Sequence, residues 1–186
     1  MTRIIAGSGR GRRLAVPAGR DIRPTSDRVR EALFSAVESQ LGSLSGRRVM
    51  DLYAGSGALG LEALSRGAGY VLLVESDARA VKAIRTNIAS VELAGAEVAH
   101  ASVEWTLRDP PARPFDLVLA DPPYSMAEGG LTAALSGLCR GWLAPEALVV
   151  VERPGRATPL VWPGCLTGTR HRRYGETMLW YGRPAG

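Results

Sequence analysis

Cysteine, histidine and lysine are scarce in this chain of 186 residues. Cys139 and Cys165 do not form a C-x-x-C pair and no histidine supports a metal site with them, so we expect reduced thiols, no metal and no disulfide framework. No apolar stretch approaches the roughly 20 residues that span a bilayer, and Met1-Thr2-Arg3 leads into no apolar signal segment. We therefore expect a monomeric, cytoplasmic protein that binds no membrane.

Because Lys82 is the only lysine, positive charge is carried by arginine, and it is concentrated at one end of the chain. Residues 1–30 hold eight arginines against Asp21 and Asp27, while the remaining chain holds 15 basic and 16 acidic residues. This segment predicts a polyanionic partner such as nucleic acid. The alternative is that a compositional bias toward arginine decorates a solvated tail.

Two short apolar segments, 3–6 and 13–16, flank the glycine-rich stretch 7–11. The pattern predicts a small β-hairpin with a flexible, basic turn. We expect residues 1–22 to form a basic N-terminal hairpin arm that contacts this nucleic acid, and residues 23–186 to form the main domain.

The rest of the chain alternates between strand and helix patterns. A helix capped by Thr25 or Ser26 is expected to end between Gln40 and Gly42. This alternation predicts an α/β protein with a doubly wound, mostly parallel seven-stranded sheet and a C-terminal antiparallel hairpin. The predicted strands lie near 48–54, 70–75, 97–101, 115–120, 147–152, 168–174 and 177–181, and the further helices near 58–66, 77–91 and 129–140.

A strand followed by a G-x-G-x-x-G turn and a helix lies between Asp51 and Gly60. Glu75 ends the next strand, where an acid can hold both ribose hydroxyls of a nucleoside. A carboxylate at Asp51 would repel the pyrophosphate of NAD, whereas S-adenosylmethionine carries an ammonium and a sulfonium. Residues 99–103 contain no acid for the adenine amine, so Ser102 or a backbone carbonyl would take that contact. The candidate cofactor-binding residues are Asp51, Tyr53, Ala54, Gly55, Ser56, Gly57, Glu75, Ser76, Ser102 and Val103.

Asp121-Pro122-Pro123-Tyr124 follows the apolar run 115–120. An exocyclic amine on a base is a poor nucleophile because its lone pair is delocalised into the ring. Hydrogen bonds to the Asp121 carboxylate and to a proline carbonyl favour a tetrahedral nitrogen, and Tyr124 offers a face on which the base can stack. The candidate catalytic residues are Asp121, Pro122, Pro123 and Tyr124. The alternative is that the prolines only end a strand.

These motifs together resemble the bacterial 16S rRNA guanine-N2 methyltransferase family known as small-subunit methyltransferase D. The resemblance rests on segments 3–7, 23–34, 51–60, 121–124 and 174–177, and it covers nearly the whole chain. It implies a Rossmann-like class I S-adenosylmethionine-dependent methyltransferase fold. It also implies methyl transfer to N2 of one guanine in 16S rRNA, within the 30S subunit or its precursor, with S-adenosylhomocysteine as the product.

Three other functions remain open at this point. The Asp121 motif serves any exocyclic amine, so a DNA amino-methyltransferase acting on adenine N6 or cytosine N4 is one alternative. A non-catalytic RNA-binding module and an NAD-dependent oxidoreductase are the others. For an RNA substrate, the candidate contacts are Arg3, Arg10, Arg12, Arg13, Arg23, Arg28, Arg170, Arg172 and Arg173.

Overall fold

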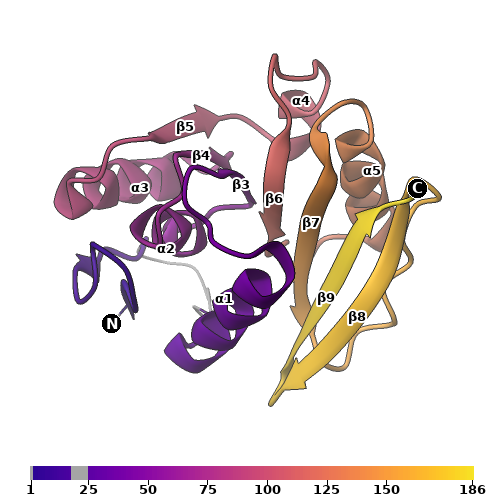
Figure 1. Ribbon diagram of the computed structural model, residues 1–186, viewed down its shortest axis with the longest axis horizontal. Helices are drawn as coiled ribbons and strands as arrows, with labels where there is room; N and C mark the ends of the chain where they lie inside the picture. The colour runs from indigo at the N-terminus through magenta and orange to yellow at the C-terminus, as the bar shows by residue number, and fades with distance from the viewer. Residues whose placement is uncertain (1, 18–24) are drawn as a thin grey trace.

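A mixed seven-stranded sheet forms the centre of the molecule (Figure 1). The computed structural model describes residues 2–17 and 25–186. The sheet has the order β5-β4-β3-β6-β7-β9-β8; β5, β4, β3, β6 and β7 are parallel, and β9 is antiparallel to both of its neighbours. The predicted α/β class, the sheet and its C-terminal hairpin are confirmed. The strands are β3 (Arg48–Leu52), β4 (Tyr70–Glu75), β5 (Ala96–His100), β6 (Phe115–Ala120), β7 (Leu143–Pro154), β8 (Leu166–Tyr174) and β9 (Thr177–Pro184).

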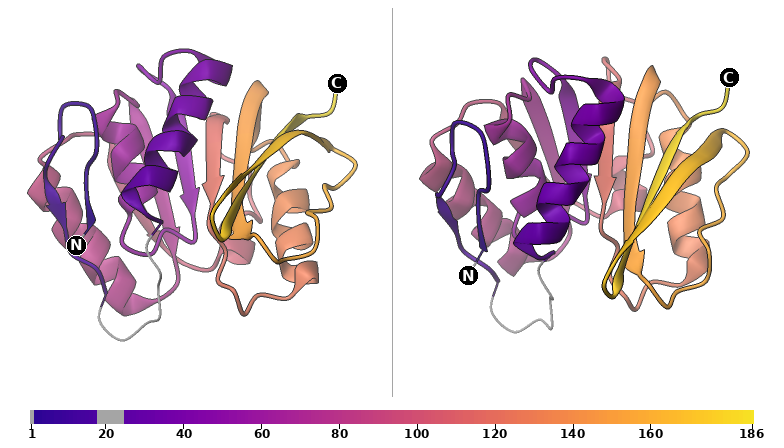
Figure 2. Two further views of the ribbon diagram at one scale, coloured as in Figure 1. Left: turned by 90° about the horizontal axis from the view of Figure 1, so that it is seen from below. Right: turned by 60° about the horizontal axis from the view of Figure 1, so that its bottom comes forward.

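Helices cover both faces of this sheet (Figure 2). α1 (Asp27–Leu41), α2 (Ala58–Ser65) and α3 (Ala78–Val91) lie on one face, and the short α4 (Val103–Thr106) and α5 (Glu128–Leu138) lie on the other. Side chains of β6 alternate between the two cores, since Leu117 and Leu119 pack with α1 and α2 while Val118 and Ala120 pack with α5. Strands buried on both faces explain the continuous apolar runs in the sequence.

The order of the strands places several loops at one edge of the sheet. The chain winds outward in opposite directions from β3 and β6, which makes the crevice between their carboxyl ends the topological switch point, where ligands bind in such sheets. Leu52 pairs with Ala120, and Ala120 pairs with Val151. The residues that follow these three strand positions therefore meet at the crevice.

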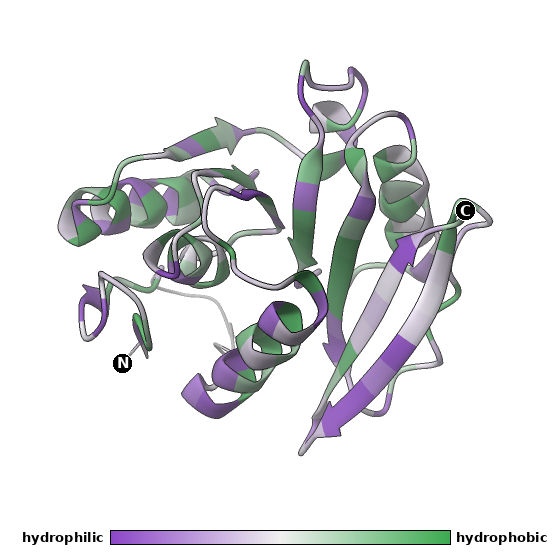
Figure 3. Cartoon of the chain, in the orientation of Figure 1, coloured by the Kyte–Doolittle hydropathy of each residue, from purple (hydrophilic) through white to green (hydrophobic). Residues whose placement is uncertain are grey.

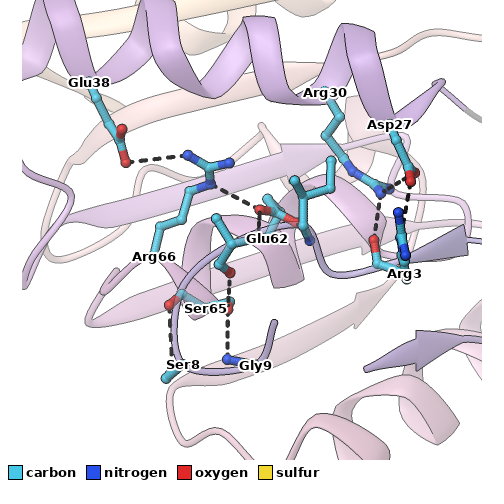
Figure 4. A network of polar contacts seen from close by, with 11 residues as sticks. Arg3, Ser8, Gly9, Asp27, Arg30, Glu38, Glu62, Ser65 and Arg66 are labelled. Carbon is cyan, nitrogen blue, oxygen red and sulfur yellow. Dashed lines mark hydrogen bonds and ion pairs between the residues drawn. The ribbon is translucent and has the colours of Figure 1, made fainter. Parts of the chain in front are cut away.

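The predicted N-terminal hairpin is present, but its turn is held in place. β1 (Thr2–Arg3) pairs with β2 (Arg13–Leu14), and the main chain of Ser8 and Gly9 donates to Ser65 of α2 at 2.9 and 2.8 Å (Figure 4). Gly7 has φ +82°, and a Cβ there would lie 1.8 Å from the Ser65 carbonyl oxygen. The expected flexible turn is therefore wrong, because contacts distant in sequence fix it. The expected boundary between residues 22 and 23 lies outside the described residues.

The cysteine prediction is also wrong, since Cys139 and Cys165 form a disulfide with Cα atoms 6.2 Å apart. It links the end of α5 to the start of β8. The two residues are 26 positions apart in sequence, so no local sequence pattern predicts the disulfide.

Hydropathy separates the inner strands from the outer one. In Figure 3 the central strands are hydrophobic, while β8 carries a hydrophilic stretch. No helix within the described residues is long and apolar enough to cross a membrane. The same residues contain no cluster of three or more His, Cys, Asp or Glu suited to a metal ion.

Candidate active site

Two cavities lie at the carboxyl edge of the sheet and share Pro123 and Met126 as wall residues. The first, of about 150 Å³, contains five predicted cofactor residues: Tyr53, Glu75, Ser76, Ser102 and Val103. The second, of about 330 Å³, contains Pro122 and Tyr124. We refer to them as the cofactor cavity and the base cavity, after the ligands that the sequence motifs predict for them. The tertiary structure thus joins two motifs that are about 70 residues apart in the chain.

The glycine-rich turn has a fixed conformation next to Tyr53 and Glu75, but its residues Ala54, Gly55, Ser56 and Gly57 do not line the cofactor cavity. Gly55 and Gly57 have φ values of +59° and +80°, in the region that favours glycine. A Cβ on Gly57 would approach Leu73 Cδ2 to 3.0 Å. Part of the glycine pattern therefore serves packing of α2 on β4.

Glu75 connects the turn to the cavity. Its carboxylate is 6% exposed and accepts hydrogen bonds from the backbone N–H groups of Gly55 and Asp77, each at 2.8 Å. Each carboxylate oxygen retains a further lone pair for a donor that enters the cavity. This arrangement provides two fixed acceptors for a pair of neighbouring hydroxyls.

Tyr53 lines the same cavity in a strained backbone conformation. Its φ of +59° is unusual for a residue with a side chain, and such strain collects at functional sites. Its hydroxyl is buried and has no hydrogen-bond partner among the described residues. Burial raises the pKa of Tyr53, which keeps the hydroxyl protonated as a donor for a ligand.

Asp51 is not on the wall of the cavity, contrary to the position that the sequence suggests. It lies within β3, is 1% exposed and accepts a hydrogen bond from the N–H of Gly60 at 2.8 Å. Burial, with the nearby charge of Glu75 as a smaller cause, raises the pKa of Asp51 to about 8. Its direct effect is to fix α2 beneath the turn. Because Asp51 does not line the cavity, its carboxylate is a weaker reason to exclude the pyrophosphate of NAD from this site.

An acidic residue that the sequence analysis missed completes the far wall of the cofactor cavity. Ser102 caps α4 by accepting a hydrogen bond from the N–H of Trp105 at 3.1 Å. This short helix turns Glu104 into the lining of the cavity. Serine is a preferred helix N-cap residue. Ser102 was therefore a signal for a short helix that brings Glu104, two residues later, to the cavity.

Glu128 and Glu152 line the base cavity, and Asp121 lies near Glu152. Asp121 is half-buried and does not itself line either cavity, whereas Glu152 of β7 is 7% exposed and lines the base cavity. Burial raises the pKa of Asp121 well above its ordinary value, and the charges of Glu152 and Asp51 add to the effect. Sequence reasoning missed Glu152, although a glutamate at the end of an apolar strand was a visible signal.

The remaining residues of the tetrapeptide, Pro122, Pro123 and Tyr124, line the base cavity. Tyr124 is 64% exposed at the mouth of the base cavity. The Pro123 carbonyl accepts a hydrogen bond from the N–H of Met126 at 2.9 Å. The Pro122 carbonyl accepts no backbone hydrogen bond from the described residues.

The predicted RNA-contacting arginines fall into two groups at opposite ends of the sheet (Figure 1). In the N-terminal group, Arg3 pairs with Asp27 at 3.2 Å and Arg12 with Glu92 at 3.0 Å. The buried Arg30 is structural, since it donates to the Arg3 carbonyl at 2.5 Å. Arg23 lies outside the described residues. The remaining candidates are exposed: Arg10, Arg13 and Arg28 in the first group, and Arg170, Arg172 and Arg173 on β8.

Comparison with known proteins identifies the family. The model of the family described as "Conserved hypothetical protein 95" matches residues 2–183. Ribosomal RNA small subunit methyltransferase D of Escherichia coli is 40% identical over 152 residues, which cover 81% of this chain and 73% of that protein. The chain belongs to the small subunit methyltransferase D family. The putative rRNA methyltransferase YlbH of Bacillus subtilis is 35% identical over 179 residues, covering 94% of this chain and 95% of that protein.

Solved structures agree with the small subunit methyltransferase D assignment. The putative methyltransferase yhhF from Escherichia coli superposes with a TM-score of 0.86 and 33% identity, covering 98% of this chain and 97% of that chain. A putative methylase from Haemophilus influenzae gives a TM-score of 0.81 and 33% identity, covering 100% of this chain and 99% of that chain. The predicted family and the Rossmann-like methyltransferase fold are therefore confirmed.

Proposed function

We propose that this protein transfers a methyl group from S-adenosylmethionine to the exocyclic N2 amine of one guanine in 16S rRNA, within the small ribosomal subunit or its precursor. The observation that carries the proposal is the pair of cavities that meet at Pro123 and Met126. One holds fixed acceptors suited to a nucleoside, and the other holds carboxylate and aromatic groups suited to a base. The names of the relatives supply the ribosomal substrate.

The donor set of the cofactor cavity fits S-adenosylmethionine. Glu75 has free lone pairs for the two ribose hydroxyls, Glu104 can accept the adenine amine, and the Tyr53 hydroxyl can donate to a polar group of the methionine part. When bound, S-adenosylmethionine supplies a methyl group activated on a sulfonium. The glycine turn and Pro123 would hold the bound molecule against the base cavity.

The chain's own residues prepare the guanine amine for attack. The Asp121 carboxylate and the Pro122 carbonyl accept the two N2 hydrogens, which turns the nitrogen lone pair out of conjugation and toward the methyl carbon. The new N–C bond forms as the sulfonium–carbon bond breaks, leaving a neutral thioether. The methylated nitrogen then releases one proton, and Asp121 accepts it. Tyr124 stacks on the flipped base, so positioning provides most of the acceleration.

The exposed arginines would hold the RNA backbone around this site. We propose that the hairpin within residues 1–22 contacts phosphates on one side and that Arg170, Arg172 and Arg173 contact them on the other. A ribosomal substrate places the protein in the cytoplasm.

A labelling experiment tests this function against its alternatives. The protein is incubated with S-adenosylmethionine carrying a labelled methyl group and, separately, with undermethylated 30S particles, naked 16S rRNA and duplex DNA. We expect label on N2 of one guanine in the 30S particles. Preferential labelling of DNA would replace the proposal with a DNA amino-methyltransferase, and no labelling of any nucleic acid would favour a binding module.

A further inference from the structure

We infer that Glu152 recognises the N1–H of the target guanine, and that Thr25 positions the Glu152 carboxylate for this contact. Glu152 would thereby select guanine over other bases that carry an exocyclic amine. This inference rests on the proposed function and adds a specificity determinant that the Asp121 motif does not contain.

The register of the sheet places the two carboxyl groups side by side. Ala120, the last residue of β6, pairs in parallel with Val151 of β7, and neighbouring strands are separated by about 4.8 Å. Asp121 directly follows β6 and Glu152 follows Val151 within β7; burial and the charge of Glu152 raise the pKa of Asp121. Glu152 lines the base cavity beside Pro122, Pro123 and Tyr124.

Thr25 holds one side of the Glu152 carboxyl group. Its hydroxyl donates a hydrogen bond of 2.8 Å to Glu152 Oε2, across 127 positions of the sequence. Glu152 lines the base cavity, and no donor among the described residues bonds its Oε1. Burial raises the pKa of Glu152, and the Thr25 hydrogen bond opposes this effect by favouring the ionised acceptor.

Guanine presents two adjacent N–H donors, N1–H and the N2 amine, on its Watson–Crick edge. Adenine and cytosine instead place an unprotonated ring nitrogen beside their amines. Two neighbouring carboxyl groups match adjacent donors, because Asp121 can accept from N2 and Glu152 from N1. With adenine or cytosine, a buried Glu152 acceptor would face another acceptor and remain unpaired, which sites of this kind reject strongly.

The test uses 2-aminopurine, which keeps the 2-amine but has no hydrogen on N1. Reconstituted 30S particles carry either guanine or 2-aminopurine at the target position, and methylation of each is measured by mass spectrometry of the digested RNA. The enzymes are the wild type, Glu152→Gln, Thr25→Val and Glu146→Gln. Glu146 is an exposed glutamate at the other end of β7 and provides the matched control.

We expect the wild type and Glu146→Gln to prefer guanine by at least about a hundredfold. Glu152→Gln should reduce this preference at least tenfold, because its amide can donate to the unprotonated N1. Thr25→Val should reduce it by a smaller factor. Binding of S-adenosylhomocysteine should be unchanged in all three variants, which shows that each is folded.

An unchanged guanine preference in Glu152→Gln would overturn the inference while leaving the proposed function intact. If Glu152→Gln fails to bind S-adenosylhomocysteine, the inference is tested by the guanine preference of Thr25→Val. An unchanged guanine preference in Thr25→Val would also overturn the inference. Failure of the wild type to methylate guanine in the particles would instead remove the proposed function itself.

Discussion

Glu75 on one side of Pro123, and Asp121 and Glu152 on the other, are held in opposite ways. On the cofactor side, Glu75 accepts hydrogen bonds from two backbone N–H groups. On the base side, the only hydrogen bond from a described residue to either Asp121 or Glu152 comes from Thr25. Asp121 also lies near the buried charges of Glu152 and Asp51, which raise its pKa further.

This difference fits the different tasks that we propose for the two sides. A carboxylate fixed by backbone donors is a permanent acceptor for a nucleoside and requires no change during turnover. In the proposed reaction the N–H groups of the base donate to Asp121 and Glu152, and Asp121 then takes up a proton. The fixed side suits binding, and the incompletely paired side suits chemistry. Perturbed carboxyl groups beside a cavity are common at catalytic sites.

The largest expected effect is on the base side. Asp121→Asn should lower the rate of methyl transfer by at least about a hundredfold. The amine loses its carboxylate acceptor, and no carboxylate remains to take up the released proton. The dissociation constant of S-adenosylmethionine should stay within about twofold, which calorimetric titration would measure. A similar loss of S-adenosylmethionine binding in Asp121→Asn would contradict the proposal that Asp121 acts on the base and not on the cofactor.

A smaller and complementary effect is expected on the cofactor side. Glu75→Ala should raise the dissociation constant of S-adenosylhomocysteine at least about tenfold. Because the N–H groups of Gly55 and Asp77 also lose their acceptor, the free energy of unfolding should fall by about 1–3 kcal/mol. Glu97→Ala, at an exposed glutamate of β5, is the control. If Glu75→Ala keeps full affinity for S-adenosylhomocysteine but loses most of its methyl transfer, Glu75 does not serve cofactor binding as proposed.

The third prediction concerns Asp51, which lies beneath the turn and interacts electrostatically with both sides. Its pKa is about 8 in the folded protein, against 3.8 as the ordinary value. Between these values the folded state binds more protons than the unfolded state, so the free energy of unfolding should fall as pH rises from about 4 to 8. The slope from this one group is at most about 1.4 kcal/mol per pH unit.

Urea denaturation between pH 5 and 8.5 would measure this slope. Asp51→Asn should flatten it, because the amide oxygen can still accept from Gly60 but does not titrate. Asp109→Asn, at an exposed position, should leave it unchanged. If the Asp51 variant keeps the wild-type slope, another buried group is responsible.

The smallest effects are expected from the two basic surfaces, one on each half of the molecule. The hairpin packs beside the cofactor half, and β8 forms the edge of the base half. Replacing Arg10 and Arg13 by glutamine should weaken RNA binding and reduce the slope of log affinity against log salt by about 0.7–0.9 for each lost phosphate contact.

The same change at Arg170 and Arg172 provides the comparison in filter-binding measurements at several salt concentrations. A smaller salt slope in both double variants would indicate that the RNA contacts both halves of the molecule. An unchanged slope in either pair would exclude that surface from phosphate contact.

Local patterns predicted the elements with boundaries that mostly agree to within a few residues. The strand at 70–75 and the strand at 115–120 match β4 and β6, because apolar runs between turns define them without outside help. α4 was not predicted, since four residues carry too little periodicity. The disulfide was missed for a different reason, because it depends on how α5 and β8 come together.

For the site, sequence alone identified the two motifs whose residues lie next to one another in the chain. The glycine turn, Glu75 and the Asp121 tetrapeptide follow from strand ends, turn chemistry and the needs of an exocyclic amine. The tertiary structure decided what lies around them: Asp51 beneath the turn, Glu104 on the cavity wall, and Thr25 bonded to Glu152 across 127 positions. The physical reason is that strand pairing and burial bring together residues whose separation in sequence carries no local signal.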